Sequence, residues 1–184
     1  MKEKLRKPSH VFPLPVTIVG ALVDGKPNFI TLAWNGVVDY GVLSISVGKT
    51  RHTLKGIQQT GVFSVNIPST NLIAETDYCG TVSGKDVDKS RVFKVFYGEL
   101  KDAPMIEECP VTMECKVLHS YEYPTHYLFA GEIVATYAER DIFTGDTIDP
   151  RKLCPFFFTT TDMSYYHLGE RIARGWEPGK KYKK

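Results

Sequence analysis

The segment Ser44–Thr53 holds the densest group of residues that could do chemistry, because two serines in a strand-like pattern lead into a basic turn rich in hydroxyls. A short helix is expected directly after this turn. A helix start leaves backbone N–H groups without intrahelical acceptors, and Arg51 and Thr53 would add side-chain donors beside them. The pattern therefore predicts a site for one phosphate group. A surface turn in which Thr50 or Thr53 caps the helix explains the segment equally well.

Three common catalytic motifs are absent from the sequence. Gly48-Lys49-Thr50 resembles the end of a phosphate-binding loop, but Leu43 stands where that motif needs its first glycine. The chain has no G-x-G-x-x-G and no G-x-S-x-G. Nucleotide triphosphatase, Rossmann-type and hydrolase functions are therefore not predicted.

Histidine and cysteine spacing gives no metal motif. The five histidines form no H-x-x-x-H pair and the four cysteines form no C-x-x-C pair, so no metal ligand is predicted. The cysteines are expected to be reduced and mostly buried, and they are Cys79, Cys109, Cys115 and Cys154.

Charge and hydropathy exclude two kinds of partner. The net charge is +2, and the basic excess lies in Lys2–Lys7 and Lys180–Lys184, with no basic stripe interleaved with aromatic residues. No nucleic-acid partner is therefore expected. Pro13 and Pro15 interrupt the first apolar stretch, so neither a signal peptide nor a membrane span is predicted, and a cytoplasmic location is expected.

A mainly β fold must position these residues. The length of 184 residues favours a single domain, 1–184, with its core at about 11–172 and a basic C-terminal tail. Asp24-Gly25 predicts a hairpin turn, and helices are expected at Leu54–Thr60 and from Thr70 to about Tyr78. Strands are predicted at Val16–Val23, Phe29–Trp34, Val42–Val47, Val62–Ile67, Val92–Tyr97, Val111–Tyr121, Tyr127–Tyr137 and Phe156–Thr160. Short connections favour an antiparallel, closed or half-closed barrel.

Several stretches stand together in one order: Pro13–Val16, Lys26–Trp34, Ser46–Thr53, Gly61–Pro68, Ser83–Lys89, His126–Ile133 and Tyr165–Glu170. In this order and spacing the chain resembles the flavin reductase-like, flavoredoxin-type family. The resemblance implies an antiparallel, FMN-binding split β-barrel with a few short helices, assembled as a homodimer. One departure is Tyr121–Thr125, where relatives are richer in Gly and Asp, and it lies on the substrate side.

The resemblance also implies a set of cofactor-binding residues. Beside the isoalloxazine ring it places Thr31, Leu32, Ala33 and Trp34, and under the ring's edge Ser46, Val47 and Gly48. At the phosphate it places Arg51, His52 and Thr53, with Asn66 and Lys89 as further contacts. His126 is the candidate catalytic residue. Without the family context, Trp34 fits a core residue, Asn66 a strand-end turn, Lys89 a cation in a solvated loop, and His126 the start of a strand.

The function implied is an NAD(P)H:flavin oxidoreductase, with NADH or NADPH as possible electron donor. The alternative is a flavoredoxin-like electron carrier reduced by a redox protein partner, and a split barrel that has lost its flavin is a third possibility. No acid–base triad is needed for the first two, because the flavin itself supplies the redox chemistry.

Overall fold

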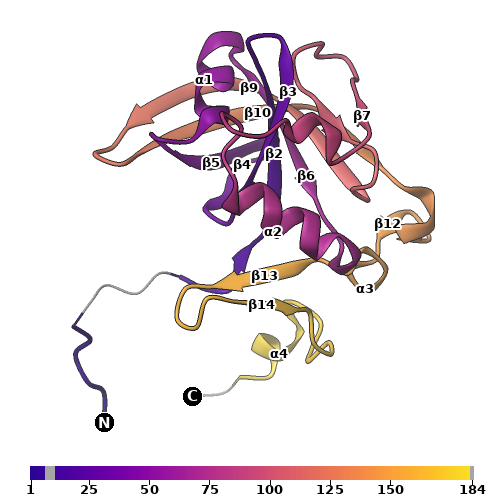
Figure 1. Cartoon of the computed structure of the whole chain (residues 1–184). Helices are drawn as coiled ribbons and strands as arrows, with labels where there is room; N and C mark the ends of the chain where they lie inside the picture. Colours follow the sequence, from indigo (N-terminus) through magenta and orange to yellow (C-terminus); the bar gives the residue numbers. More distant parts are fainter. Residues whose placement is uncertain (7–10, 183–184) are drawn as a thin grey trace.

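A seven-stranded antiparallel sheet forms the centre of the computed structural model, which describes residues 1–6 and 11–182 (Figure 1). The strands lie side by side in the order β3-β2-β6-β9-β10-β5-β4. Their bounds are β2 (Thr17–Val23), β3 (Lys26–Leu32), β4 (Asn35–Asp39), β5 (Val42–Gly48), β6 (Val62–Ile67), β9 (Val111–Glu122) and β10 (His126–Ala138). The antiparallel, mainly β split barrel with a few short helices is confirmed.

The side chain of Asn35 helps to close the barrel between its two edge strands. Its Nδ2 atom lies 3.0 Å from the carbonyl oxygen of Pro15, 3.2 Å from Thr17 Oγ1 and 3.3 Å from the carbonyl oxygen of Leu32. The start of β4 is thereby tied to the start of β2 and the end of β3. The backbone N–H of Ser46 also donates to the carbonyl of Trp34 at 2.8 Å, which holds the connection between β3 and β4 against β5.

Apolar residues from both halves of the sheet fill the barrel interior. On β5, Leu43, Ile45 and Val47 are buried in this core, while the alternate residues Ser44, Ser46 and Gly48 are only partly buried. The period of two therefore turns the serines and Gly48 toward the opposite face. That face carries the candidate site.

The first hairpin turns as the sequence predicts. Asp24 and Gly25 both have positive φ, 50° and 77°, which matches the two-residue turn whose twist suits antiparallel strands.

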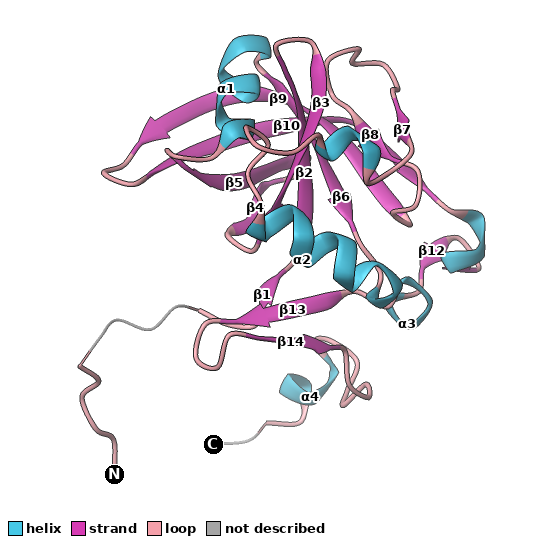
Figure 2. Cartoon of the chain, viewed as in Figure 1, coloured by secondary structure: helices cyan, strands magenta, loops and turns pink. Residues whose placement is uncertain are grey.

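Two longer helices pack against the sheet (Figure 2). Helix α1 (His52–Thr60) follows β5, buries Leu54 and Ile57 in the barrel core, and ends at Gly61, which has φ 69°. Helix α2 (Ile73–Thr81) follows the 3-10 turn η1 (Thr70–Leu72) and buries Cys79 in a second apolar cluster.

Smaller elements complete the chain. Besides the 3-10 turns η2 (Lys89–Arg91) and η3 (Arg140–Ile142), the helices are α3 (Pro150–Leu153) and α4 (Glu177–Lys180). The remaining strands are β1 (Leu14–Pro15), β7 (Val95–Phe96), β8 (Met105–Ile106), β11 (Phe143–Thr144), β12 (Thr147–Ile148), β13 (Phe156–Thr159) and β14 (Ser164–His167). In the described part of the chain, no helix combines the length and apolar character that a membrane crossing needs.

Two expectations about individual elements were wrong, and one strand of the main sheet was missed. The strand predicted at Val92–Tyr97 is only β7, because Val92 ends the 3-10 turn η2 and Phe93 is buried beneath α2 instead of pairing in a sheet. Strand β4 was not predicted. Neither Thr50 nor Thr53 caps α1, since Arg51 is the N-cap residue and no side chain bonds there.

The structure describes the two basic ends only in part. Residue 7 of the first basic segment and residues 183–184 of the second lie outside the described residues. All four cysteines are free thiols, and three are buried as expected, whereas Cys154 is exposed.

Candidate functional site

An aromatic pair marks one end of the candidate site. The rings of Trp34 and His126 lie with their centroids 4.7 Å apart and their planes tilted by 32°. Strand pairing explains the contact, because His126 is opposite Gly48 across β10 and β5, and Ser46 bonds to the carbonyl of Trp34. Thr125 Oγ1 lies 2.9 Å from His126 Nδ1 and helps to orient the imidazole.

Gly48 joins this aromatic end to the start of helix α1. A Cβ atom built on Gly48 would lie 3.5 Å from Arg51 Cγ and 3.6 Å from His126 Nε2, in the space between the two side chains. Arg51 in turn donates from Nη1 to the carbonyl of Gly80 at 3.4 Å, at the end of α2. Thr31 donates from its hydroxyl to the carbonyl of Thr76 on the same helix. The ends of β3, β5 and α2 thus meet around Arg51.

The start of α1 has the properties of an anion-binding end. The helix begins without a side-chain cap, so no capping side chain accepts a hydrogen bond from the N–H groups of its first turn. The positive end of the helix dipole and the Arg51 guanidinium lie at the same place. A cleft of about 220 Å³ opens here, lined by Asn28, Ile30, Thr50, Arg51, His52, Thr53, Val82, Ser83, Gly84 and Lys89.

Lys89 supplies a buried positive charge to this cleft. The side chain is 3% exposed, and its ammonium donates to the carbonyls of Phe29 at 3.0 Å and Cys79 at 2.7 Å. Burial lowers the pKa of Lys89 from its ordinary value. The lysine therefore ties β3 to α2 while it lines the cleft, and the solvated-loop interpretation of this residue is wrong.

His52 stands in positive surroundings at the cleft. Burial and the charges of Lys55 and Lys85 lower the pKa of His52 below its ordinary value of 6.5. The imidazole is therefore neutral at pH 7, and can act either as donor or as acceptor of a hydrogen bond.

The side chains of some predicted site residues are not available to a ligand in this cleft. Leu32 and Val47 are part of the barrel core, so only their backbone can reach a ligand. Ala33 is half-buried between Leu32 and Trp34. Thr53 lines the cleft, but it is 1% exposed and its hydroxyl accepts a hydrogen bond from Asn28 Nδ2 at 2.7 Å.

Asn66 belongs to the interior of the sheet and is not brought to the cleft. It is 0% exposed, and its Nδ2 donates to the carbonyl of Ile18 at 2.9 Å and to Ser64 Oγ at 3.0 Å. Its Oδ1 accepts from the N–H of Ile106 at 2.9 Å. The side chain links β2 to β8, and its predicted contact with a cofactor is therefore corrected to a structural role.

Sequence reasoning did not name six of the cleft residues as site residues, and these are Asn28, Ile30, Thr50, Val82, Ser83 and Gly84. The signal for Asn28 is a polar residue within an otherwise buried strand, since it is 5% exposed on β3. Gly84 allows a very close approach, because a Cβ there would lie 2.0 Å from Asn28 Oδ1. The polar loop after α2 therefore rests directly on β3 and α1.

The arrangement suits an elongated ligand with a flat ring at one end and an anionic group at the other. The Trp34–His126 pair offers an aromatic surface, and the uncapped helix with Arg51 and Lys89 offers positive charge. Within the described ranges, no three His, Cys, Asp or Glu side chains come together as a metal site.

Comparison with known proteins identifies the family. The model of the flavin reductase like domain matches residues 9–156. A crystal structure of flavoredoxin from Methanosarcina acetivorans is 42% identical with a TM-score of 0.94, covering 98% of each chain. Flavoredoxin of Desulfovibrio vulgaris is 30% identical with a TM-score of 0.88, covering 97% of this chain and 100% of that one. An FMN-binding protein from Thermus thermophilus, 21% identical with a TM-score of 0.81 over 95% of this chain and 97% of the other, shares the fold. The chain, a split β-barrel of the flavoprotein type, belongs to the flavin reductase-like domain family.

Proposed function

We propose that the surface from Trp34 across Gly48 to the cleft at Arg51 binds FMN, and that the protein is a redox flavoprotein. The observation that carries this proposal is that Gly48 lies between His126, whose ring contacts Trp34, and Arg51 at the uncapped start of α1, so that an aromatic pair and a guanidinium border the same space. The donor set fits the group, since a phosphate seeks N–H donors and positive charge. The FMN-binding relative from Thermus thermophilus supports the choice of flavin.

The two ends of this surface would contact different parts of FMN. Arg51, Lys89 and the first N–H groups of α1 would hold the phosphate, while Trp34, between β3 and β4, and His126, on β10, would contact the isoalloxazine ring. Gly48 lies under the ring's edge, because any side chain there would enter the space between Arg51 and His126. A flavin held in this way supplies two-electron redox chemistry, because its ring system accepts and returns hydride.

The activity that we propose is NAD(P)H-dependent flavin reduction, with NADH or NADPH as the hydride donor. In this reaction the protein's task is to position the two ring systems and to polarise the flavin, so a catalytic triad is not required. His126 is the side chain best placed to touch a substrate at the ring end, because it is half-buried and its ring contacts that of Trp34 in a tilted arrangement.

A flavoredoxin-like electron carrier is the second candidate function. The two flavoredoxins that this chain is similar to, at 42% and 30% identity, favour it. Such a carrier would take electrons from a redox protein partner and react slowly with free nicotinamide.

A visible absorption spectrum of the purified protein with added FMN, followed by NADH or NADPH under anaerobic conditions, tests both candidates. A bound flavin band that bleaches with either nicotinamide supports the reductase. A band that persists with both nucleotides but bleaches with dithionite supports the carrier. The absence of any bound flavin would overturn the proposal itself.

We also propose that the protein is a homodimer through the surface around β4. An apolar pocket of about 560 Å³ lies beside β4 and β5, and the nearby Val37 and Tyr40 are 91% and 102% exposed. An edge strand with exposed apolar residues gains stability when a second copy covers it. Light scattering should give twice the chain mass, and Val37→Lys should shift the protein to monomer, whereas a monomeric wild type would contradict the proposal.

A further inference from the structure

A pocket of about 420 Å³ lies at the end of β10 that is remote from His126. Its walls come from β7, from the start of β9 with the turn before it, and from the last residues of β10. His126 begins the same strand, so the length of β10 separates this pocket from the candidate flavin site. What binds here is therefore independent of the proposed function.

Aromatic and apolar side chains form the walls of this pocket. The rings of Phe96 and Tyr137 meet edge to face, with their centroids 5.8 Å apart and their planes at 87°. Tyr137 donates its hydroxyl to the carboxylate of Glu114 at 2.9 Å, which fixes the orientation of this ring. Cys109 and Pro110 are buried beside the two rings. Such walls suit the apolar or aromatic body of a small organic molecule.

One hydroxyl at this pocket lacks a hydrogen-bond partner. Thr112 lines the pocket and is 2% exposed, and its Oγ1 is buried without any partner in the described part of the chain. The neighbouring polar side chains on the same face of the sheet, Ser64, Asn66 and Glu114, are all paired. An unpaired buried hydroxyl costs free energy, and a ligand that forms a hydrogen bond with it would recover that cost.

The rim of the pocket carries two carboxylates that no cation balances. Glu107 and Glu139 line it, and neither forms an ion pair with another of the described residues. The guanidinium of Arg140 lies over the Phe143 ring instead, 5.5 Å from its centroid. Burial and the charge of Asp141 raise the pKa of Glu139, as expected of a carboxylate that pairs with no cation. The pocket therefore offers an uncompensated negative charge.

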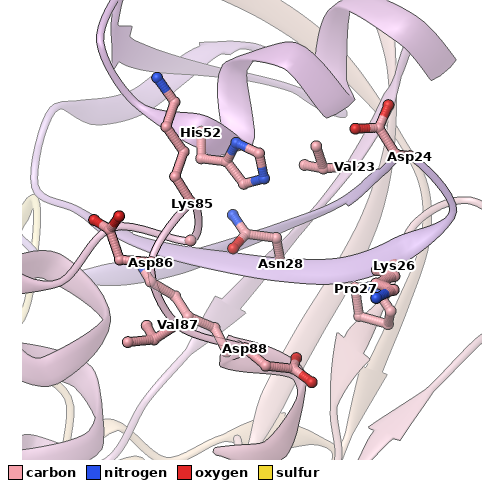
Figure 3. Close-up of a pocket in the computed structure, with 12 residues that line it drawn as sticks. Val23, Asp24, Lys26, Pro27, Asn28, His52, Lys85, Asp86, Val87 and Asp88 are labelled. Carbon is pink, nitrogen blue, oxygen red and sulfur yellow. The ribbon is translucent and has the colours of Figure 1, made fainter.

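The cleft between β3 and the loop after α2 differs from this pocket in charge (Figure 3). Three lysines line the cleft, and these are Lys26, Lys85 and Lys89. Two of its aspartates, Asp24 and Asp88, already form ion pairs with cations outside the cleft, at 2.6 Å and 3.3 Å. A small cation is therefore expected to prefer the pocket beside Tyr137.

We propose that the pocket beside Phe96 and Tyr137 binds a small organic ammonium ion with an aromatic body. The body would pack against the two rings, and the ammonium would donate hydrogen bonds to Thr112 Oγ1 and to the carboxylate of Glu139. Glu107 would add a second negative charge at the rim.

NMR titration of the full chain with 2-phenylethylamine, a primary amine that is protonated at pH 7, tests this proposal. 2-Phenylethanol and phenylacetate serve as the neutral and the anionic probe of similar size. We expect the amine to bind about tenfold more tightly than either of them. The amide signals of Phe96, Thr112 and Tyr137 should shift in a saturable way, and those of Trp34 and His126 should not.

Two variants separate the contribution of the charge from that of the hydroxyl. Glu139→Gln should weaken amine binding about fivefold and leave 2-phenylethanol binding unchanged, and Thr112→Val should weaken amine binding about threefold. The matched controls are Glu132→Gln and Thr136→Val, which change exposed residues of β10 that do not line the pocket. Thr112→Val should also keep or raise the free energy of unfolding, because it removes an unpaired buried hydroxyl.

Several outcomes would overturn the proposal. They are equal affinity for the amine and phenylacetate, shifts confined to other surfaces, amine binding unchanged in both variants, or no saturable shift at about 10 mM amine. A clear loss of stability in Thr112→Val would overturn the assignment of the ammonium to this hydroxyl. None of these results requires bound FMN, so they are distinguishable from a failure of the proposed function.

Discussion

Replacing Gly84 with alanine should disturb the candidate site more than the addition of one methyl group anywhere else in it. A Cβ atom at Gly84 would lie 2.0 Å from Asn28 Oδ1, 2.8 Å from Asn28 Cγ and 3.0 Å from His52 Cδ2. Such contacts are far inside van der Waals distance, so the loop must move away from β3 and α1.

The loss of stability depends on how far the Asn28 side chain can move away from the new methyl group. Asn28 is 5% exposed and its Nδ2 is held by Thr53 Oγ1 at 2.7 Å, so it has little room to retreat. Overpacking of this kind costs about 1–3 kcal/mol. Because the displaced loop lines the proposed phosphate cleft, we expect FMN affinity to fall at least about tenfold, which corresponds to about 1.4 kcal/mol.

Urea unfolding and calorimetric titration with FMN measure the two effects separately. Gly169→Ala is the matched control, because a Cβ there meets nothing within 4 Å. Both quantities should stay at wild-type values in the control. If Gly84→Ala also keeps wild-type stability and FMN affinity, the packing of this loop on Asn28 is not what shapes the cleft.

Three further substitutions test Gly48 in the site and two hydrogen-bonded side chains. Gly48→Ala should fold normally, because its Cβ contacts of 3.5 Å and longer are ordinary, yet it should weaken FMN binding in a fluorescence titration; unchanged affinity would remove Gly48 from the site. Glu114→Gln should lower the free energy of unfolding by about 1.5–3 kcal/mol in a urea titration. Both oxygens of the buried carboxylate accept hydrogen bonds, including one from Tyr137 at 2.9 Å, and the NH2 group of glutamine cannot accept; a loss under 0.5 kcal/mol would contradict this. Burial and the hydrogen bond to Asp77 raise the pKa of Tyr165 to about 12. The contribution of the protonated Tyr165 side chain to the free energy of unfolding is therefore complete below pH 10 and is lost as pH rises through 12. The stability difference between wild type and Tyr165→Phe should therefore shrink over that pH range, and a constant difference would refute the assignment.

The sequence predicted those features of the fold that depend on the backbone preferences and alternation of neighbouring residues. Asp24-Gly25 gives a turn because both residues accept positive φ, and Gly61 ends α1 for the same reason. The alternation on β5 also holds, since Ile45 and Val47 enter the core and Ser46 does not. These features depend on neighbours within a few residues.

Long-range contacts decided the rest, and no local pattern reports them. Lys89 is buried only because β3 and α2 each present a carbonyl to its ammonium. Asn66 is structural because β2 and β8 saturate its amide. Asn28 joined the cleft because the loop at Gly84, far along the chain, settles on it. The resemblance to a flavin-binding family assigns the phosphate to the start of α1, which stays a prediction, and it could not separate residues that line the cleft from residues that build it.

The phosphate dependence of flavin binding tests the central claim most directly. Titrations with FMN and with riboflavin, which lacks the phosphate, should be made on wild type and on Arg51→Ala. We expect wild type to bind FMN more tightly than riboflavin, and Arg51→Ala to lose about tenfold in FMN affinity with little change for riboflavin. Equal affinity of wild type for the two flavins, or an FMN affinity unaffected by Arg51→Ala, would contradict a phosphate site at the start of α1.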